Sequence, residues 1–292
     1  MKRKLAGTLY GIIASTSYGT NPLFALPLYS AGLGVNSVLF YRYFFACLIY
    51  YVWLKFIKKI NLKITLKEFF PLIFIALFFS FSSLTLFDSF NYIESGVACT
   101  ILFIYPIFVT IIMALFFKER ISKTVISAIL LTSIGIILLY NGKDNINLNL
   151  KGIGLVLLSA LLYALYIVSV KKIRILQHIK SEKLSFYVML FGLWVYIINL
   201  NFCTNLQIPN KPYLWLFTLG LALFPTIISI ETITIAIKLI GSTSTAILGA
   251  LEPLTAIFFG VVFFSEELTY KIICGIFCIL TGVILIVVKK MK

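Results

Sequence analysis

The stretch that decides the fold is YPIFVTIIMALFFKERIS, residues 105–122, which the chain nearly repeats as EPLTAIFFGVVFFSEELT, residues 252–269. In both stretches a proline stands second, an apolar run leads to a Phe-Phe pair, and a glutamate follows two residues later. Proline interrupts a long helix, because it lacks an N–H donor and clashes with the preceding turn. The repetition predicts two related halves, each with a broken apolar helix at the same place.

The composition identifies an integral membrane protein. Hydrophobic residues make up 61% of the chain and charged residues only 12%, with a mean hydropathy of +1.06, which leaves too little polar surface for a water-soluble protein of 292 residues. A membrane-spanning helix needs about 20 mostly apolar residues. We therefore expect an all-α fold of ten transmembrane helices, near residues 5–28, 36–56, 69–91, 95–117, 122–141, 152–172, 184–203, 213–237, 242–264 and 270–288.

The positive charges lie on alternate loops. The net charge of +15 comes from 25 Lys and Arg against 10 Asp and Glu, and the cations predicted outside are only Lys143, Lys151, Lys211 and Lys271. This is the positive-inside pattern, so both termini are predicted to be cytoplasmic. No basic patch is interleaved with exposed aromatic residues, so we expect lipid around the bundle and no nucleic-acid partner. The oligomeric state is left open, a monomer included.

The repeat extends over the whole chain. Offsets of 147 and 145 residues give matched pairs that include Glu119 with Glu266, Gly135 with Gly282, Gly7 with Gly152 and Tyr18 with Tyr163. Two five-helix repeats follow, residues 1–141 and residues 142–292. Because five is odd, the second repeat enters the membrane from the opposite side, and the halves are predicted to be inverted repeats.

Both repeats resemble the paired signatures of EamA-type carriers in the drug/metabolite transporter superfamily. The segments that carry the resemblance are YPIFVTIIMALFFKERIS, AIKLIGSTSTAILGALEPLTAIFFGVVFFSEELT and GVILIV. The resemblance implies a ten-helix carrier of the bacterial cytoplasmic (inner) membrane, commonly an exporter of amino acids or other small metabolites. It also implies a central cavity lined mainly by helices 1, 3, 4, 6, 8 and 9.

Ionisable residues inside the predicted spans are candidates for function. Each costs about 2.5 to 3.5 kcal/mol at the centre of a spanning helix, and the four are Arg42, Asp88, Glu231 and Glu252. Arg42 and Asp88 both fall in the outer half of their helices and are predicted to form a structural ion pair. The alternative is that Arg42 binds a substrate carboxylate.

The two glutamates have no equally buried cation. Glu252 falls near the membrane midplane, and Glu231 nearer the cytoplasmic end of its helix. Burial penalises the charged form of a lone carboxylate, so both are candidates for proton or cation coupling. The alternative is a neutral carboxyl hydrogen-bonded to helix backbone without a role in transport.

Aromatic residues supply the candidate substrate contacts. Tyr18 and Asn21 share one helix face, Tyr163 and Tyr166 share another, and Tyr105 precedes a proline. Aromatic walls with a few polar groups suit a small amphipathic ligand, although packing between helices accounts for most aromatic residues in such a chain.

Two prolines are predicted to break helices. Pro106 and Pro253 should free the carbonyls four residues earlier, and matched breaks in two repeats point to a site near the midplane. The alternative is that these prolines only bend the helices for packing.

The sequence favours a carrier over an enzyme. His178, the one histidine, falls in a basic loop, and neither a GxSxG nor an HExxH motif occurs. We expect no catalytic residues, metal or cofactor. The prediction is a secondary-active transporter of small metabolites such as amino acids or amines, working by alternating access and coupled to protons. A non-coupled facilitator or channel is the alternative.

Overall fold

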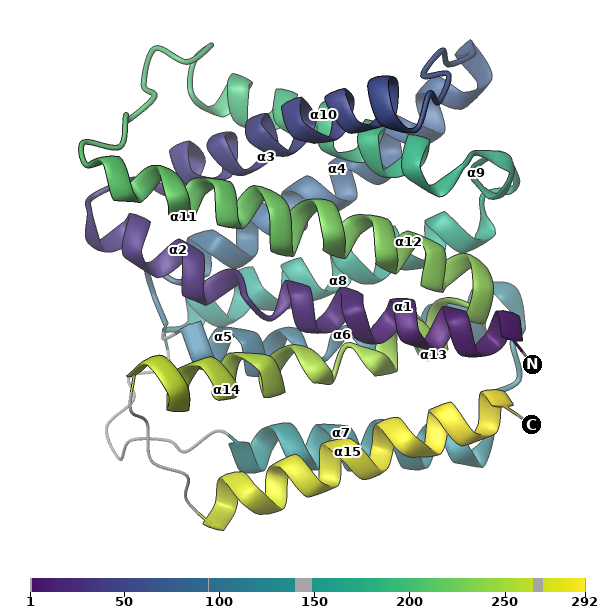
Figure 1. The fold of residues 1–292 in the computed structure, drawn as a ribbon. Coiled ribbons are helices and arrows are strands. Elements are labelled where there is room, and N and C mark those ends of the chain that lie inside the picture. Colours follow the sequence, from purple (N-terminus) through teal and green to yellow (C-terminus); the bar gives the residue numbers. More distant parts are fainter. Residues whose placement is uncertain (1, 94, 140–148, 265–269, 292) are drawn as a thin grey trace.

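The computed structural model describes residues 2–93, 95–139, 149–264 and 270–291, which fold as a bundle of helices without a strand (Figure 1). The boundary predicted between residues 141 and 142 lies outside the described residues. The helices are α1 (Lys2–Tyr18), α2 (Asn21–Ser30), α3 (Val35–Val52), α4 (Leu66–Ser89), α5 (Ser95–Leu102), α6 (Tyr105–Phe117), α7 (Lys123–Leu139), α8 (Leu150–Lys172), α9 (Arg174–His178), α10 (Ser181–Asn199), α11 (Pro212–Ala222), α12 (Ser229–Ile240), α13 (Ser242–Leu248), α14 (Leu251–Phe264) and α15 (Tyr270–Met291). Short π-helical segments, Trp53–Ile57 and Leu223–Ile228, continue α3 and join α11 to α12.

The helices are long and apolar enough for a membrane protein. Five described helical stretches, taken with their π-helical segments, could cross a bilayer by length and composition: Val35–Ile57, Leu66–Ser89, Leu150–Lys172, Ser181–Asn199 and Pro212–Ile240. The two chain ends lie at the same end of the bundle (Figure 1). The ten crossings and the cytoplasmic side of both termini stay predictions.

Three of the expected spans are broken into two helices. The first span is α1 and α2, the fourth is α5 and α6, and the ninth is α13 and α14. The second helix of each broken span begins with a proline in its first turn, at Pro22, Pro106 and Pro253. A proline is tolerated there because the first N–H groups of a helix have no partner within it.

The contact between α7 and α15 shows how the two halves are related. A Cβ added to Gly135 would lie 2.7 Å from the Gly275 carbonyl oxygen, and one added to Gly282 would lie 3.0 Å from the Ala128 carbonyl oxygen. Gly135 corresponds to Gly282 in the repeat, and Ala128 to Gly275, so the same contact is made twice. As residue numbers rise along α7 their partners' numbers fall along α15, which makes the pair antiparallel. Reciprocal antiparallel contacts of this kind require a pseudo-twofold axis across the bundle.

A second reciprocal contact joins the first helix of each half to the other half. The Cβ position of Gly7 on α1 meets Leu239 and Ile240 at the end of α12, and that of Gly152 on α8 meets Tyr92 and Ile93 after α4. Each half therefore packs its first helix into the other half, α1 on α12 and α8 on α4. The absence of a side chain at each glycine lets the two helices approach closely.

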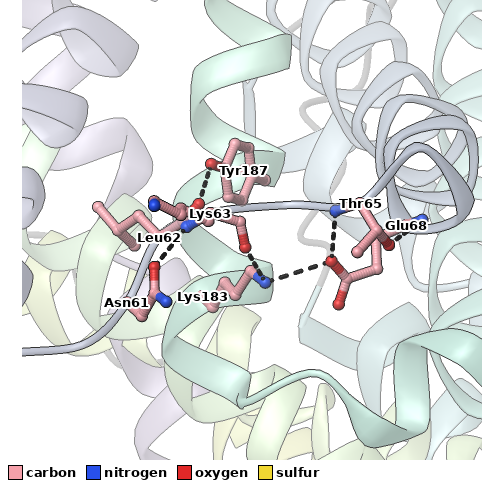
Figure 2. Close-up of polar contacts among 7 residues, drawn as sticks. All are labelled: Asn61, Leu62, Lys63, Thr65, Glu68, Lys183 and Tyr187. Carbon is pink, nitrogen blue, oxygen red and sulfur yellow. Dashed lines mark hydrogen bonds and ion pairs between the residues drawn. The ribbon is translucent and has the colours of Figure 1, made fainter.

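A polar network joins helix α10 to the loop that precedes α4. The Lys183 Nζ donates to the Lys63 carbonyl at 2.6 Å and lies 3.3 Å from Glu68 Oε2 (Figure 2). Glu68 also completes a capping box with Thr65, whose side chain accepts from the Glu68 N–H. Tyr187 of α10 donates to a carbonyl of the same loop. Within the described ranges, the contact of Lys183 with Glu68 is the one ion pair formed.

Candidate functional site

The three broken spans meet around one cavity. It is lined from the α1–α2 break by Tyr18, Gly19, Asn21 and Pro22, from the α5–α6 break by Leu102 and Phe103, and from the start of α14 by Glu252 and Pro253. Leu86 and Phe90 complete part of the wall from the end of α4. The cavity measures about 20 Å³, which leaves room for about one water molecule. In this conformation it is too small for a metabolite.

Close backbone contact holds two of the breaks together. A Cβ on Gly19 would lie only 2.4 Å from the Glu252 carbonyl oxygen. The first residue of the α1–α2 break must therefore be a glycine for α14 to approach. This contact fixes the start of α14 beside the end of α1 and brings Glu252 to the cavity.

The Glu252 side chain has one hydrogen-bond partner in the described structure. It is 9% exposed, and its Oε1 accepts from the Tyr105 hydroxyl at 3.4 Å. Tyr105 occupies the position in the first half that Glu252 occupies in the second, 147 residues away. Gly249 makes room for this pairing, because a Cβ there would lie 1.5 Å from the Tyr105 hydroxyl oxygen.

A cluster of four tyrosines adjoins the cavity through Tyr18. Tyr18 stacks on Tyr163 with ring centroids 6.0 Å apart, and Tyr105 meets the edge of Tyr163 at 4.8 Å. Tyr166 stacks on Tyr163 at 6.2 Å, and its hydroxyl shares a hydrogen bond with Thr234 at 3.3 Å. Of these four tyrosines, Tyr18 lines the cavity and Tyr105 donates to Glu252, while Tyr163 and Tyr166 extend the aromatic cluster away from the cavity lining.

Asn21 faces the cavity without partners. The side chain is 4% exposed, and among the residues that the structure describes neither its amide nitrogen nor its amide oxygen has a hydrogen-bond partner. Buried side-chain amides are nearly always satisfied, because leaving one unpaired costs about 1 to 3 kcal/mol. Asn21 is also the first residue of α2, where backbone N–H groups point out of the helix. A ligand in the cavity could satisfy both groups.

The sequence predicts that Pro106 and Pro253 interrupt long helices from within, whereas the structure places them near the starts of new helices. Pro106 and Pro253 lie in the first turns of α6 and α14, and the helix is interrupted just before each of them. The Gly249 carbonyl, predicted to be free, accepts a hydrogen bond from the Glu252 N–H at 2.9 Å. Each interruption is therefore followed directly by a new helix, α6 or α14, that begins near the cavity.

The predicted ion pair between Arg42 and Asp88 is wrong. Arg42 is fully buried and donates through Nε to Thr226 Oγ1 at 2.6 Å and through Nη2 to the Pro225 carbonyl at 3.0 Å. Asp88 accepts instead from the Asn91 side-chain amide, at 3.2 Å. Both residues lie at similar depths, but their side chains point to different neighbours.

The cause lies in another proline, Pro225. Pro225 has no N–H for the Leu221 carbonyl four residues earlier, and the Thr226 hydroxyl takes that place with a 2.7 Å hydrogen bond. The oxygen of Thr226 is then free to accept from Arg42, so the guanidinium is drawn to the π-helical segment between α11 and α12. The sequence signal for this contact is a proline followed by threonine in an apolar span.

Glu231 lies apart from the cavity. It stands in the first turn of α12 and is half-buried. The Tyr50 side chain lies beside it, yet the Tyr50 hydroxyl forms no hydrogen bond in the described structure. Glu231 and Glu252 therefore do not belong to one site. A role for Glu231 in proton or cation coupling would require a polar pathway separate from the cavity.

Comparison with known proteins agrees with the fold. Residues 5–141 and 150–288 each match the EamA-like transporter family. A protein of Archaeoglobus fulgidus (strain ATCC 49558 / DSM 4304 / JCM 9628 / NBRC 100126 / VC-16), described as an uncharacterized transporter, is 35% identical over 75 residues, which are 26% of each chain. The match thus spans about a quarter of that relative.

The three-dimensional comparison extends over nearly the whole chain. A crystal structure of a protein with 14% sequence identity aligns with a TM-score of 0.78 over 96% of this chain and 95% of the other. At that identity the likeness shows a shared fold. Two family matches, one in each half, and the reciprocal packing of those halves lead to one conclusion: the chain belongs to the EamA-like transporter family, whose members are membrane transporters.

Proposed function

We propose that this protein is a secondary-active transporter of small metabolites such as amino acids or amines. It works by alternating access, with its substrate at the cavity between the three helix breaks. The direction is export and the location is the bacterial cytoplasmic membrane, both of which rest on the resemblance to EamA-type carriers. Substrate, direction and coupling are the parts of this proposal that experiments must test.

One observation carries the proposal. Residues that correspond in the two repeats touch each other at the cavity, Tyr18 with Tyr163 and Tyr105 with Glu252. Equivalent residues of a twofold pair can touch only beside the axis that relates them. We therefore infer that the cavity lies beside the pseudo-twofold axis, an arrangement that would let two inverted halves exchange conformations around a fixed site.

Glu252 is the proposed coupling residue. It is the carboxyl that faces the cavity, and the equivalent position in the first half is the neutral phenol of Tyr105. A carboxyl there can hold a proton or the ammonium group of a substrate. The Glu252 carboxyl is neutral when it holds a proton and negatively charged when it binds an ammonium group. This difference in charge can favour the inward-facing or the outward-facing conformation of the carrier.

The test is flux through the purified protein in proteoliposomes. A carrier predicts saturable movement of labelled amino acids or amines, and faster exchange when unlabelled substrate is placed on the opposite side. A facilitated pore, the alternative, predicts flux that opposite-side substrate does not accelerate. Accelerated exchange would support alternating access, and non-saturating flux would contradict it.

A further inference from the structure

The loop between α3 and α4 forms a strap across one end of the bundle. This first strap, residues 58–64, contains no helix and lies at the end where both chain termini lie (Figure 1). Its apolar side chains, Ile60, Leu62 and Ile64, alternate with exposed polar ones and pack against the core. This alternation is that of an extended segment with one covered face. The first strap therefore covers the core at this end of the bundle.

Helix α10, which belongs to the second half, holds the first strap. The Lys183 ammonium group donates to the Lys63 carbonyl at 2.6 Å and pairs with Glu68, just beyond the strap, at 3.3 Å (Figure 2). Tyr187, one turn further along α10, donates to the Leu62 carbonyl. The side chains of the ion pair are 13% and 21% exposed, so water screens the pair only in part. These bonds join the two halves of the chain at this end.

An equivalent strap lies at the opposite end of the bundle. With the repeat offset of 147, residues 58–64 correspond to residues 205–211, in the loop between α10 and α11 (Figure 1). In this second strap Gln207 accepts from the Gly34 N–H through its side chain, and its own N–H donates to Ser37 Oγ at 3.1 Å. Each half therefore ties its strap to the first turn of the equivalent helix in the other half, α10 or α3.

The two straps differ in charge. At the same offset Lys183 on α10 corresponds to Asn36 on α3. Asn36 accepts a neutral hydrogen bond from the Asn199 side-chain amide at 3.5 Å, whereas Lys183 pairs with the Glu68 carboxylate. Among the residues that the structure describes, the first strap is thus the one that is held by opposite charges. A charged contact that is made in one conformation of a carrier and not in the other favours the first of them.

The cavity lies far from the first strap. Leu86, which lines the cavity, follows Glu68 on α4 by about five turns of helix, roughly 27 Å. Alternating access requires a path from the site to each end of the bundle in turn. Contacts at the end with the termini must therefore separate in one of the two conformations, and the bonds between the first strap and α10 lie at that end.

We propose that the first strap is a gate at the end of the bundle that carries the termini, and that the ion pair of Lys183 with Glu68 holds this gate closed. The inference rests on the proposed alternating access and identifies contacts that control it. Partly exposed ion pairs stabilise a structure only modestly, which suits a contact that must open in every transport cycle. Loss of the pair shifts the carrier toward the conformation that is open at this end.

The experiment follows Cys99, a native cysteine that lines the cavity. The other native cysteines are replaced, and a small membrane-impermeant thiol reagent is added to membrane vesicles on the side that exposes an N-terminal tag. The labelling rate of Cys99 then reports how often the cavity opens at that end. Lys183→Gln and Glu68→Gln should each raise this rate about twofold to fivefold. The double variant should raise it no further than Lys183→Gln alone, because both changes remove the same pair.

Four features of the variants separate the gate from a general loosening of the fold. Glu68→Gln keeps the capping box, since glutamine serves in it as well as glutamate. Lys183→Arg keeps the ion pair and should label at the wild-type rate. Lys180→Gln removes a neighbouring exposed charge and is the matched control, which should also label at the wild-type rate. Gln207→Ala weakens the second strap, at the opposite end, and should not raise labelling from the side of the tag.

The outcomes also separate the gate from the transport function. Unchanged labelling in both Lys183→Gln and Glu68→Gln, with wild-type Cys99 reacting from both sides of the membrane, would overturn the gate and leave alternating access in place. An equal rise in Lys180→Gln would overturn it too, because any loss of positive charge would then have the same effect. Reaction of Cys99 from a single side in wild type and in every variant would contradict alternating access itself, and the gate with it.

Discussion

The Tyr105 hydroxyl donates to the Glu252 carboxyl at 3.4 Å, although the two residues are 147 positions apart and occupy the same place in two repeats. Tyr18 and Tyr163, another matched pair, stack at 6.0 Å. These contacts locate the pseudo-twofold axis within the site. They also show that the two halves differ in chemistry at the axis itself, with a phenol on one side and a carboxyl on the other.

Not every helix break in the first half has a counterpart in the second half. The fourth and ninth spans are both interrupted, but α8 is continuous while its counterpart in the first half is divided into α1 and α2. Gly19 and Pro22 have no equivalent glycine or proline in α8, where the offset of 145 gives Ala164 and Ile167. Differences in sequence therefore explain why only the first span is divided. We expect this division to persist in both the inward-facing and the outward-facing conformations of the carrier.

The first prediction concerns the partner of Arg42. Arg42→Gln and Thr226→Val should show a coupling free energy of about 1.5 to 3 kcal/mol in a double-mutant cycle, because the bond involves a charged donor. Thermal or denaturant unfolding in detergent gives the required stabilities. The same cycle with Asp88→Asn should be additive to within about 0.5 kcal/mol. Strong coupling of Arg42 to Asp88 and none to Thr226 would restore the ion pair.

The second prediction concerns the room that Gly249 leaves for Tyr105. Gly249→Ala should destabilise the protein by about 1 to 3 kcal/mol, since the new methyl group overlaps the Tyr105 hydroxyl. Gly154→Ala is the control, because no atom lies within 4 Å of its Cβ position, and alanine should stabilise helix α8 by up to about 1 kcal/mol. Equal unfolding temperatures for the two variants would argue against the close approach of Tyr105 to Gly249.

The third prediction concerns topology. In a background without the five native cysteines, Gln207→Cys in the loop before α11 should react with a membrane-impermeant maleimide added outside intact cells. Asn61→Cys in the loop before α4 should react only after the membrane is opened. The reason is the excess of Lys and Arg on the side of Asn61. Labelling of both positions from the same side would refute the ten-span arrangement.

Much of the fold could be predicted from the sequence. Apolar runs of about 20 residues predicted where the helices lie, because a helix is the only structure that satisfies an isolated backbone segment in lipid. The repeated proline motif also predicted the interruptions before Pro106 and Pro253. The double contact of α7 with α15 could not be predicted, because the offset identifies equivalent residues without saying which of them touch.

The site could be predicted only in part. Depth along a helix can be estimated by counting residues, and the count placed Glu252 near the membrane midplane. The direction in which a side chain points around the helix depends on how the helix is rotated against its neighbours. That rotation directs Arg42 to Thr226 and away from Asp88, and it directs the Tyr166 hydroxyl to Thr234.

Glu252 is the residue proposed to couple substrate movement to a proton. The most direct measurement is substrate accumulation in proteoliposomes with and without an imposed pH gradient, for wild type, Glu252→Gln and Glu231→Gln. Wild type and Glu231→Gln should concentrate substrate only when the gradient is present. Glu252→Gln should fold, retain exchange at equal concentrations and lose accumulation, because its amide cannot take up or release a proton. Accumulation by Glu252→Gln that still follows the pH gradient would contradict this account.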